Sequence, residues 1–135
     1  MKLKTLFLIC SLSLFINSCS DNGKAAPKLS VGMIKVSIMY PNTEDGTFNM
    51  EYYKKNHMPM LKELFGDVLK HYAIESGISG RTAEEPATYL AVGHLYLNTL
   101  EDYQKSFGKH AKTILNDIPN YTNIKPIVQI SKIVK

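Results

Sequence analysis

The chain is poor in cysteine and lacks several motifs that mark common enzyme classes. Its 135 residues contain two cysteines, Cys10 and Cys19, both near the N-terminus. The rest of the chain therefore has no thiol for a disulfide, a redox pair or a cysteine metal site. It also lacks a serine nucleophile elbow and a His-Glu-x-x-His zinc helix. Residues 77–80, Gly-Ile-Ser-Gly, resemble a phosphate loop only superficially, because they lie between two predicted strands and no helix follows.

No stretch of the chain concentrates charge of one sign. The formal net charge is +4, and loss of Lys2 and Lys4 with a cleaved N-terminal signal would lower it to about +2. The remaining lysines are interleaved with acidic residues. We therefore expect no nucleic-acid partner, because such proteins usually carry a basic stripe.

Residues 1–18 have the layout of a bacterial lipoprotein signal. Lysines come first, an apolar run follows over residues 6–16, and the segment ends in Ile-Asn-Ser before Cys19. The run is shorter than the roughly 20 apolar residues of a membrane-spanning helix. We expect cleavage before Cys19, lipidation of that cysteine, and an exported protein anchored to a membrane of the bacterial cell envelope. The alternative is an ordinary secretory signal that happens to contain a cysteine.

The rest of the chain divides into a tether and one domain. Residues 19–32 are rich in Asp, Asn, Gly, Lys, Ala and Pro and are typical of a flexible tether. Residues 33–135, about 100 in number, suffice for one modest core. Their periodicity predicts a ferredoxin-like βαββαβ fold of the α+β class, with both helices on one face of an antiparallel sheet. The predicted elements are strand 33–40, helix 49–65, strand 68–78, strand 88–98, helix 99–118 and strand 124–134.

A histidine lies at the centre of the apolar side of the first helix. Asn49 is a suitable N-cap for this helix. At 100° per residue, His57 shares one side with Met50, Tyr53, Met60, Leu61 and Leu64. Pro59 should kink or restart the helix two residues later. The simpler interpretation is a core histidine that hydrogen-bonds to backbone, and the functional one is an acid–base group.

Two further side chains join His57 as candidates for a catalytic site. Tyr53 lies one turn before His57, and His110 lies at the edge of the apolar stripe of the second helix. Because both helices cover the same sheet face, we expect the two imidazoles to approach one cleft, where a tyrosine could stabilise an oxyanion. His94 lies on a central strand whose face stays unassigned. A metal site needs three or four ligands, which this set does not supply, so we expect no metal.

The domain from Met33 onward resembles the EthD family, named after ethyl tert-butyl ether degradation. The motifs that carry the resemblance occur in order. They are Met-Ile-Lys-Val-Ser-Ile-Met-Tyr-Pro at 33–41, Tyr-Tyr-x-x-x-His-Met-Pro at 52–59, Gly-His-Leu-Tyr at 93–96, Phe-Gly-x-His-Ala at 107–111 and Ile-Pro-Asn-Tyr-Thr at 118–122.

The resemblance implies a homodimer in which two ferredoxin-like sheets close back to back into an α/β barrel. It also implies that Tyr53, His57 and His110 are the functional residues. The family is often labelled reductase, and relatives with this barrel include cofactor-free monooxygenases, decarboxylases and cyclases of aromatic compounds. A lipoprotein signal departs from this family, whose members are commonly cytoplasmic.

Two functions follow from these observations. The first is a small cofactor-independent enzyme, an oxidoreductase or a lyase, that acts on a hydrophobic carbonyl or phenolic compound by histidine acid–base chemistry. In that case His57 moves the proton, and His110 and Tyr53 orient the substrate. The second is a non-catalytic dimeric module that binds a small hydrophobic ligand, with its histidines as core residues.

Overall fold

A computed structural model describes residues 29–135 of the chain. The expected signal, Cys19 and most of the expected tether fall within residues 1–28 and lie outside the described part. Among the described residues, no helix combines the length and apolar character needed to cross a membrane.

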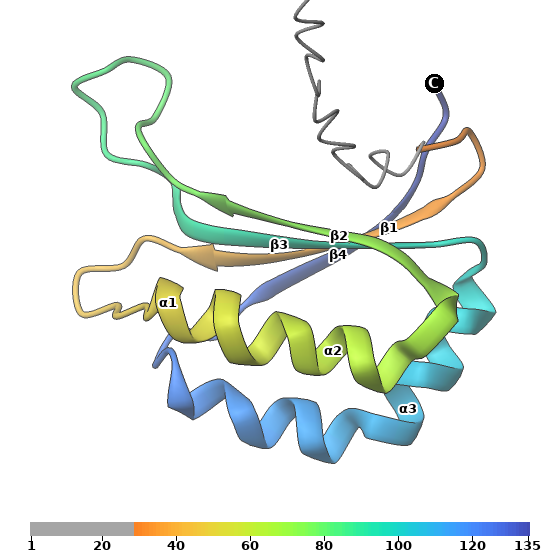
Figure 1. Ribbon diagram of the computed structural model, residues 1–135. Helices are drawn as coiled ribbons and strands as arrows, with labels where there is room; N and C mark the ends of the chain where they lie inside the picture. Colours follow the sequence, from red (N-terminus) through yellow and green to blue (C-terminus); the bar gives the residue numbers. More distant parts are fainter. Residues whose placement is uncertain (1–28) are drawn as a thin grey trace, which may run out of the picture.

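The four strands form one antiparallel sheet (Figure 1). Its spatial order is β2-β3-β1-β4, so the two strands nearest the chain ends, β1 and β4, lie side by side. This order confirms the ferredoxin-like α+β fold. The last strand begins later than expected because Pro126, which has no N–H for the ladder, comes just before it. The strands are β1 (Ile34–Pro41), β2 (Leu69–Ser76), β3 (Tyr89–Leu97) and β4 (Ile127–Lys132).

The helices lie together on one face of the sheet, as expected (Figure 1). The side chain of Asn49 accepts a hydrogen bond from the backbone N–H of Tyr52 at 3.0 Å, and Thr99 caps the second helix in the same way. Gly66 ends the first helix with φ of 57°, a conformation that suits glycine. The helical segments are α1 (Met50–Tyr52), η1 (Tyr53–His57), α2 (Met58–Phe65), η2 (Gly66–Val68), α3 (Leu100–Asp117) and η3 (Ile118–Asn120).

The first helix changes its hydrogen-bonding pattern at the segment that carries His57. Residues Tyr53–His57 form a π-helical stretch, and an ordinary α-helix restarts at Met58. Pro59 then falls in the first turn of α2, where its missing N–H costs little. Such π segments often occur at functional sites. The expected restart of the helix is therefore present, and it places His57 at the junction.

The core lies between the helices and the sheet. Alternate residues of β1 and β3 point toward the helices, where Val36 and Leu97 are fully buried. Tyr53, Met58, Leu61 and Phe65 from the first helix pack against them. The helix-facing side of the sheet is therefore the apolar one.

The opposite face of the sheet carries polar side chains. His94 lies on this face, which settles an assignment that the sequence pattern left open. Its Nδ1 atom is 3.0 Å from Ser37 Oγ, and its Nε2 atom is 3.1 Å from Glu75 Oε1. Met39, Val92 and Tyr96 supply apolar surface around this cluster, by the alternation of the strand register. The face is thus a mixed surface of polar and apolar side chains.

Candidate functional site

His57 lies in the interior and is held through both ring nitrogens. Its side chain reaches from η1 toward the end of α3 and the segment that follows, and the residue is only 3% exposed. Nδ1 is 2.8 Å from Oδ2 of Asp117, and Nε2 is 3.4 Å from the hydroxyl of Tyr121. The imidazole also stacks on Tyr53, with 5.4 Å between ring centroids. The expected proximity of Tyr53 and His57 is therefore present.

Asp117 is the last residue of α3 and accepts several hydrogen bonds. The Tyr52 hydroxyl donates to Oδ1 at 2.7 Å, and the Asn120 side-chain amide donates to the same oxygen at 2.9 Å. Burial by itself would raise the pKa of Asp117. The hydrogen bonds from His57, Asn120 and Tyr52 together outweigh burial and hold this pKa below its ordinary value. Asp117 is therefore an ionised acceptor at neutral pH.

The carboxylate determines which tautomer His57 adopts. Because Asp117 accepts, Nδ1 of His57 must carry the hydrogen, and Nε2 is left as an acceptor facing Tyr121. Burial lowers the pKa of His57, and the hydrogen bond and charge of Asp117 oppose that effect only in part. The imidazole is thus neutral at pH 7, with an unprotonated Nε2 that can accept a proton.

A cluster of tyrosines extends the hydrogen bonding away from His57. The hydroxyls of Tyr121 and Tyr40 share a hydrogen bond of 2.7 Å, and the Tyr53 hydroxyl also interacts with that of Tyr40. Burial raises the pKa of all three phenols well above the ordinary value. They stay protonated at neutral pH and can donate hydrogen bonds, so a chain of exchangeable protons runs from Asp117 through His57 and Tyr121 to Tyr40.

A glycine on the central strand makes room for this cluster. A side-chain methyl group at Gly93 of β3 would overlap the hydroxyl of Tyr53. Only glycine therefore allows the Tyr53 ring to extend fully onto the sheet at this point. Gly93 precedes His94 in the Gly-His-Leu-Tyr motif. The glycine of this motif therefore makes room for Tyr53, which comes from the helix layer.

An apolar cavity of about 100 Å³ lies against this hydrogen-bonded chain. Its polar boundary comes from His57, Tyr40, Tyr53 and Tyr121, and the other lining side chains are hydrocarbon except Tyr103. A molecule in the cavity would place its one polar group against Tyr121 and Nε2 of His57. The apolar lining consists of Ile38, Leu61, Phe65, Leu95, Tyr103, Phe107, Ile114, Leu115, Ile118, Pro126 and Val128.

The structure does not bring His110 to His57. His110 lies seven residues before Asp117 on α3, which is two turns or about 10 Å along the axis. It is not among the residues that line the cavity. The contact from α3 to His57 comes instead from its last residue, Asp117. Within residues 29–135, no three histidine, cysteine, aspartate or glutamate side chains are grouped so as to hold a metal ion.

Sequence reasoning missed Asp117, Tyr121, Tyr40 and Tyr52 as members of the site. Two signals were available. Tyr121 lies inside the Ile-Pro-Asn-Tyr-Thr motif, and Asp117 comes directly before it. An acidic residue at the end of a helix is also unfavourable for the helix dipole, which indicates a local partner.

The fold and the site define a ferredoxin-like α+β domain with a buried histidine–carboxylate pair beside an apolar cavity. The sequence model of the EthD domain matches residues 44–125. The chain belongs to the EthD family.

Solved structures agree with this assignment. An EthD-like protein from Ralstonia eutropha JMP134 is 38% identical, aligns over 78% of this chain and 96% of its own, and gives a TM-score of 0.74. An ethyl tert-butyl ether degradation (EthD) family protein from Bacillus halodurans C-125 is 13% identical, with 74% and 97% of the two chains aligned and a TM-score of 0.53. The second similarity supports the fold alone. No curated protein matches the chain significantly.

Proposed function

We propose that this EthD-family protein is an enzyme that acts on a small hydrophobic carbonyl or phenolic compound, with His57 as its acid–base group. One observation carries this proposal. The carboxylate of Asp117 holds one ring nitrogen of His57, and the other nitrogen faces Tyr121 at the wall of an apolar cavity. This is the arrangement of a base oriented by a third group.

The proton moves along the hydrogen-bonded chain. A substrate hydroxyl, or a carbon next to a carbonyl, gives its proton to the Tyr121 oxygen while the Tyr121 proton moves to Nε2 of His57. The imidazolium that forms is stabilised by Asp117 at 2.8 Å. Tyr40 and Tyr53 donate hydrogen bonds near the oxygen that becomes negative. Proton transfer of this kind needs no cofactor.

The test begins with the ligand itself. Mass spectrometry of a denatured extract of the purified protein identifies the bound compound, and turnover of that compound is then measured. His57→Gln keeps a polar side chain but removes the base, so we expect kcat to fall by about 10² or more. His110→Gln is the matched control, because His110 lies outside the cavity, and it should lose much less. Full turnover by His57→Gln would refute the assignment.

The pH profile gives a second measurement on the same substrate. His57 acts as a neutral base, and burial lowers its pKa. Activity should therefore be lost only below the ordinary histidine range, rise as His57 loses its proton, and stay level above it. A profile that falls through the same pH range would contradict a base.

A second candidate is a non-catalytic module that binds a small ligand. It is favoured by the fact that both ring nitrogens of His57 already have protein partners, which is what a core histidine requires. The two candidates differ in their response to His57→Gln. Lost turnover with binding retained supports the enzyme, whereas binding of the extracted ligand with no turnover in either protein supports the module.

We also propose that the protein works as a homodimer on a membrane surface. The outer strand β4 has an unpaired edge within the described chain and exposes Ile127, Val128 and Ile130. Exposed apolar edges of this kind favour pairing with another chain. The lipoprotein-like signal before Cys19 supports an anchor in the cell envelope.

A further inference from the structure

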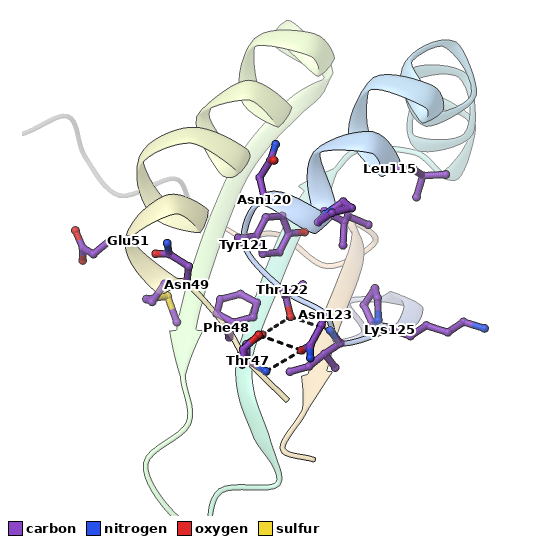
Figure 2. A pocket seen from close by; sticks show the side chains of 15 residues that line it. Thr47, Phe48, Asn49, Glu51, Leu115, Asn120, Tyr121, Thr122, Asn123 and Lys125 are labelled. Carbon is purple, nitrogen blue, oxygen red and sulfur yellow. Dashed lines mark hydrogen bonds between the residues drawn. The ribbon is translucent and has the colours of Figure 1, made fainter. Parts of the chain in front are cut away.

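A surface groove lies where the first helix begins and α3 ends (Figure 2). Residues 47–51 form one side of the groove, and residues 118–126 form the other. Asn123 connects the two sides, because its Oδ1 atom accepts hydrogen bonds from the backbone N–H of Thr47 at 2.8 Å and from the Thr47 hydroxyl at 3.2 Å. The groove is therefore a part of the folded domain with both of its sides held in place.

The groove and the cavity share a wall. Four residues, Leu115, Ile118, Tyr121 and Pro126, line both of them. Tyr121 shows this most clearly, since its hydroxyl contacts His57 and Tyr40 in the interior while its ring lies along the groove (Figure 2). The two hollows thus adjoin along these four side chains, and Leu115 is half-exposed at their common boundary.

The inner cavity is too small for more than the reacting end of a substrate. An engineered protein cavity of about 150 Å³ holds a single benzene molecule, and the cavity beside His57 measures about 100 Å³. A substrate larger than one ring must therefore extend out of the cavity, whose lining includes the half-exposed side chains of Leu115 and Val128. The groove is the neighbouring hollow, because Leu115 lines it as well.

The lining of the groove indicates what could lie there. Phe48, Met50 and Pro119 add apolar surface to the shared wall. Among the lining residues only Glu51 and Lys125 are charged, and they are of opposite sign. Glu51 is already paired with lysines of its own helix. A charged tail would gain little in this groove, whereas a hydrocarbon tail would lose contact with water.

We infer that the substrate is an elongated amphipathic molecule, with a phenol or carbonyl head in the cavity and an unbranched, uncharged tail in the groove. This inference rests on the proposed function and adds the shape of the substrate. The groove would then select chain length, since each buried methylene strengthens binding up to about fourfold. Pro119 and Met50 become residues that determine specificity without touching the head.

The experiment uses phenol and 4-ethyl-, 4-butyl- and 4-hexylphenol as probes on the purified protein. Calorimetry gives the dissociation constant of each probe, and NMR follows the ring signals of His57. Pro119→Glu places a charge in the groove, and we expect it to remove the gain in affinity with chain length. Met50→Glu does the same from the opposite side, at the first turn of α1, where an acid is favourable. Thr113→Glu is the matched control, because Thr113 is exposed on α3 and lines neither hollow.

The outcomes separate this inference from the proposal on which it rests. Affinity that rises with chain length in the parent and in Thr113→Glu, but not in either groove variant, supports the inference. If phenol shifts the His57 signals but longer tails bind no better, the inference fails and the proposed site stands. The inference is also overturned if the folded groove variants gain as much affinity with increasing chain length as the parent does. If no phenol binds or moves the His57 signals, the phenolic substrate class fails, and this inference fails with it.

Discussion

Replacing Asp117 by Asn tests the central contact of the site without any substrate. The carboxylate accepts from His57, Tyr52 and Asn120, and the side chain is only 15% exposed. Asparagine has nearly the same size and keeps one oxygen for Tyr52 and Asn120. The position facing His57 becomes an amide N–H₂, so His57 must take the other tautomer, with Nδ1 accepting and Nε2 donating to Tyr121.

The cost of this substitution can be worked out from the contacts that change. Hydrogen bonds to a charged group each contribute about 1.5–3 kcal/mol, against about 1 kcal/mol for neutral ones. All three hydrogen bonds are still made, but each now joins neutral groups. In the bond to His57, the donor and the acceptor exchange roles. We therefore expect a loss of about 1.5–6 kcal/mol in the free energy of unfolding at pH 7. For a domain of about 100 residues this corresponds to a fall in Tm of roughly 6 °C or more.

The substitution also changes how stability depends on pH. In the parent, burial lowers the pKa of His57 in the folded state, so between that pKa and the ordinary value near 6.5 the unfolded chain binds more protons. Stability is then complete above the ordinary value and declines as the pH falls through this window. Asp117 opposes the shift of His57. Its removal should lower the pKa of His57 further and extend the decline to lower pH.

Urea unfolding at several pH values and an NMR titration of the His57 ring measure these two effects. Glu63→Gln is the control, because it removes the same charge from an exposed position of α2, and it should change stability by less than about 0.5 kcal/mol. The reasoning is refuted if Asp117→Asn is as stable as Glu63→Gln. It is also refuted if the pKa of His57 in Asp117→Asn is equal to or higher than in the parent.

Three further outcomes follow from the fold and the N-terminal sequence. Gly93→Ala should lower the free energy of unfolding by about 1–3 kcal/mol, because the added methyl group overpacks against the Tyr53 hydroxyl. Adding Tyr53→Phe should restore part of this loss, as measured by thermal unfolding. If stability does not recover, the crowding lies elsewhere. Cys19→Ala should release the protein from the membrane fraction or leave it unprocessed, and a processed variant that still partitions like the parent contradicts the lipid anchor. Light scattering of the purified protein should give twice the monomer mass, because β4 exposes an apolar edge, whereas a uniform monomer at micromolar concentration contradicts the dimer.

Local patterns in the sequence sufficed for the order of the elements and for several of their ends. Asn49 was expected as an N-cap, and the second helix was expected to start at residue 99. The side chains of Asn49 and Thr99 both accept the hydrogen bond of a cap. These features depend on residues three or four positions apart, so the sequence contains them directly. The central position of His57 on the buried side of its helix follows from the same short-range periodicity.

The partners of His57 depended on how the two helices pack against each other. Helical periodicity shows which side of α3 faces inward, but it does not show how far α3 is displaced along its axis relative to the first helix. A displacement of two turns replaces His110 by Asp117 as the residue opposite His57. Tyr121 reaches the site from outside any helix, and Tyr40 comes from β1. The same holds for the sheet face on which His94 lies. Alternation divides a strand into two faces, but only the packing of the helices decides which face is covered.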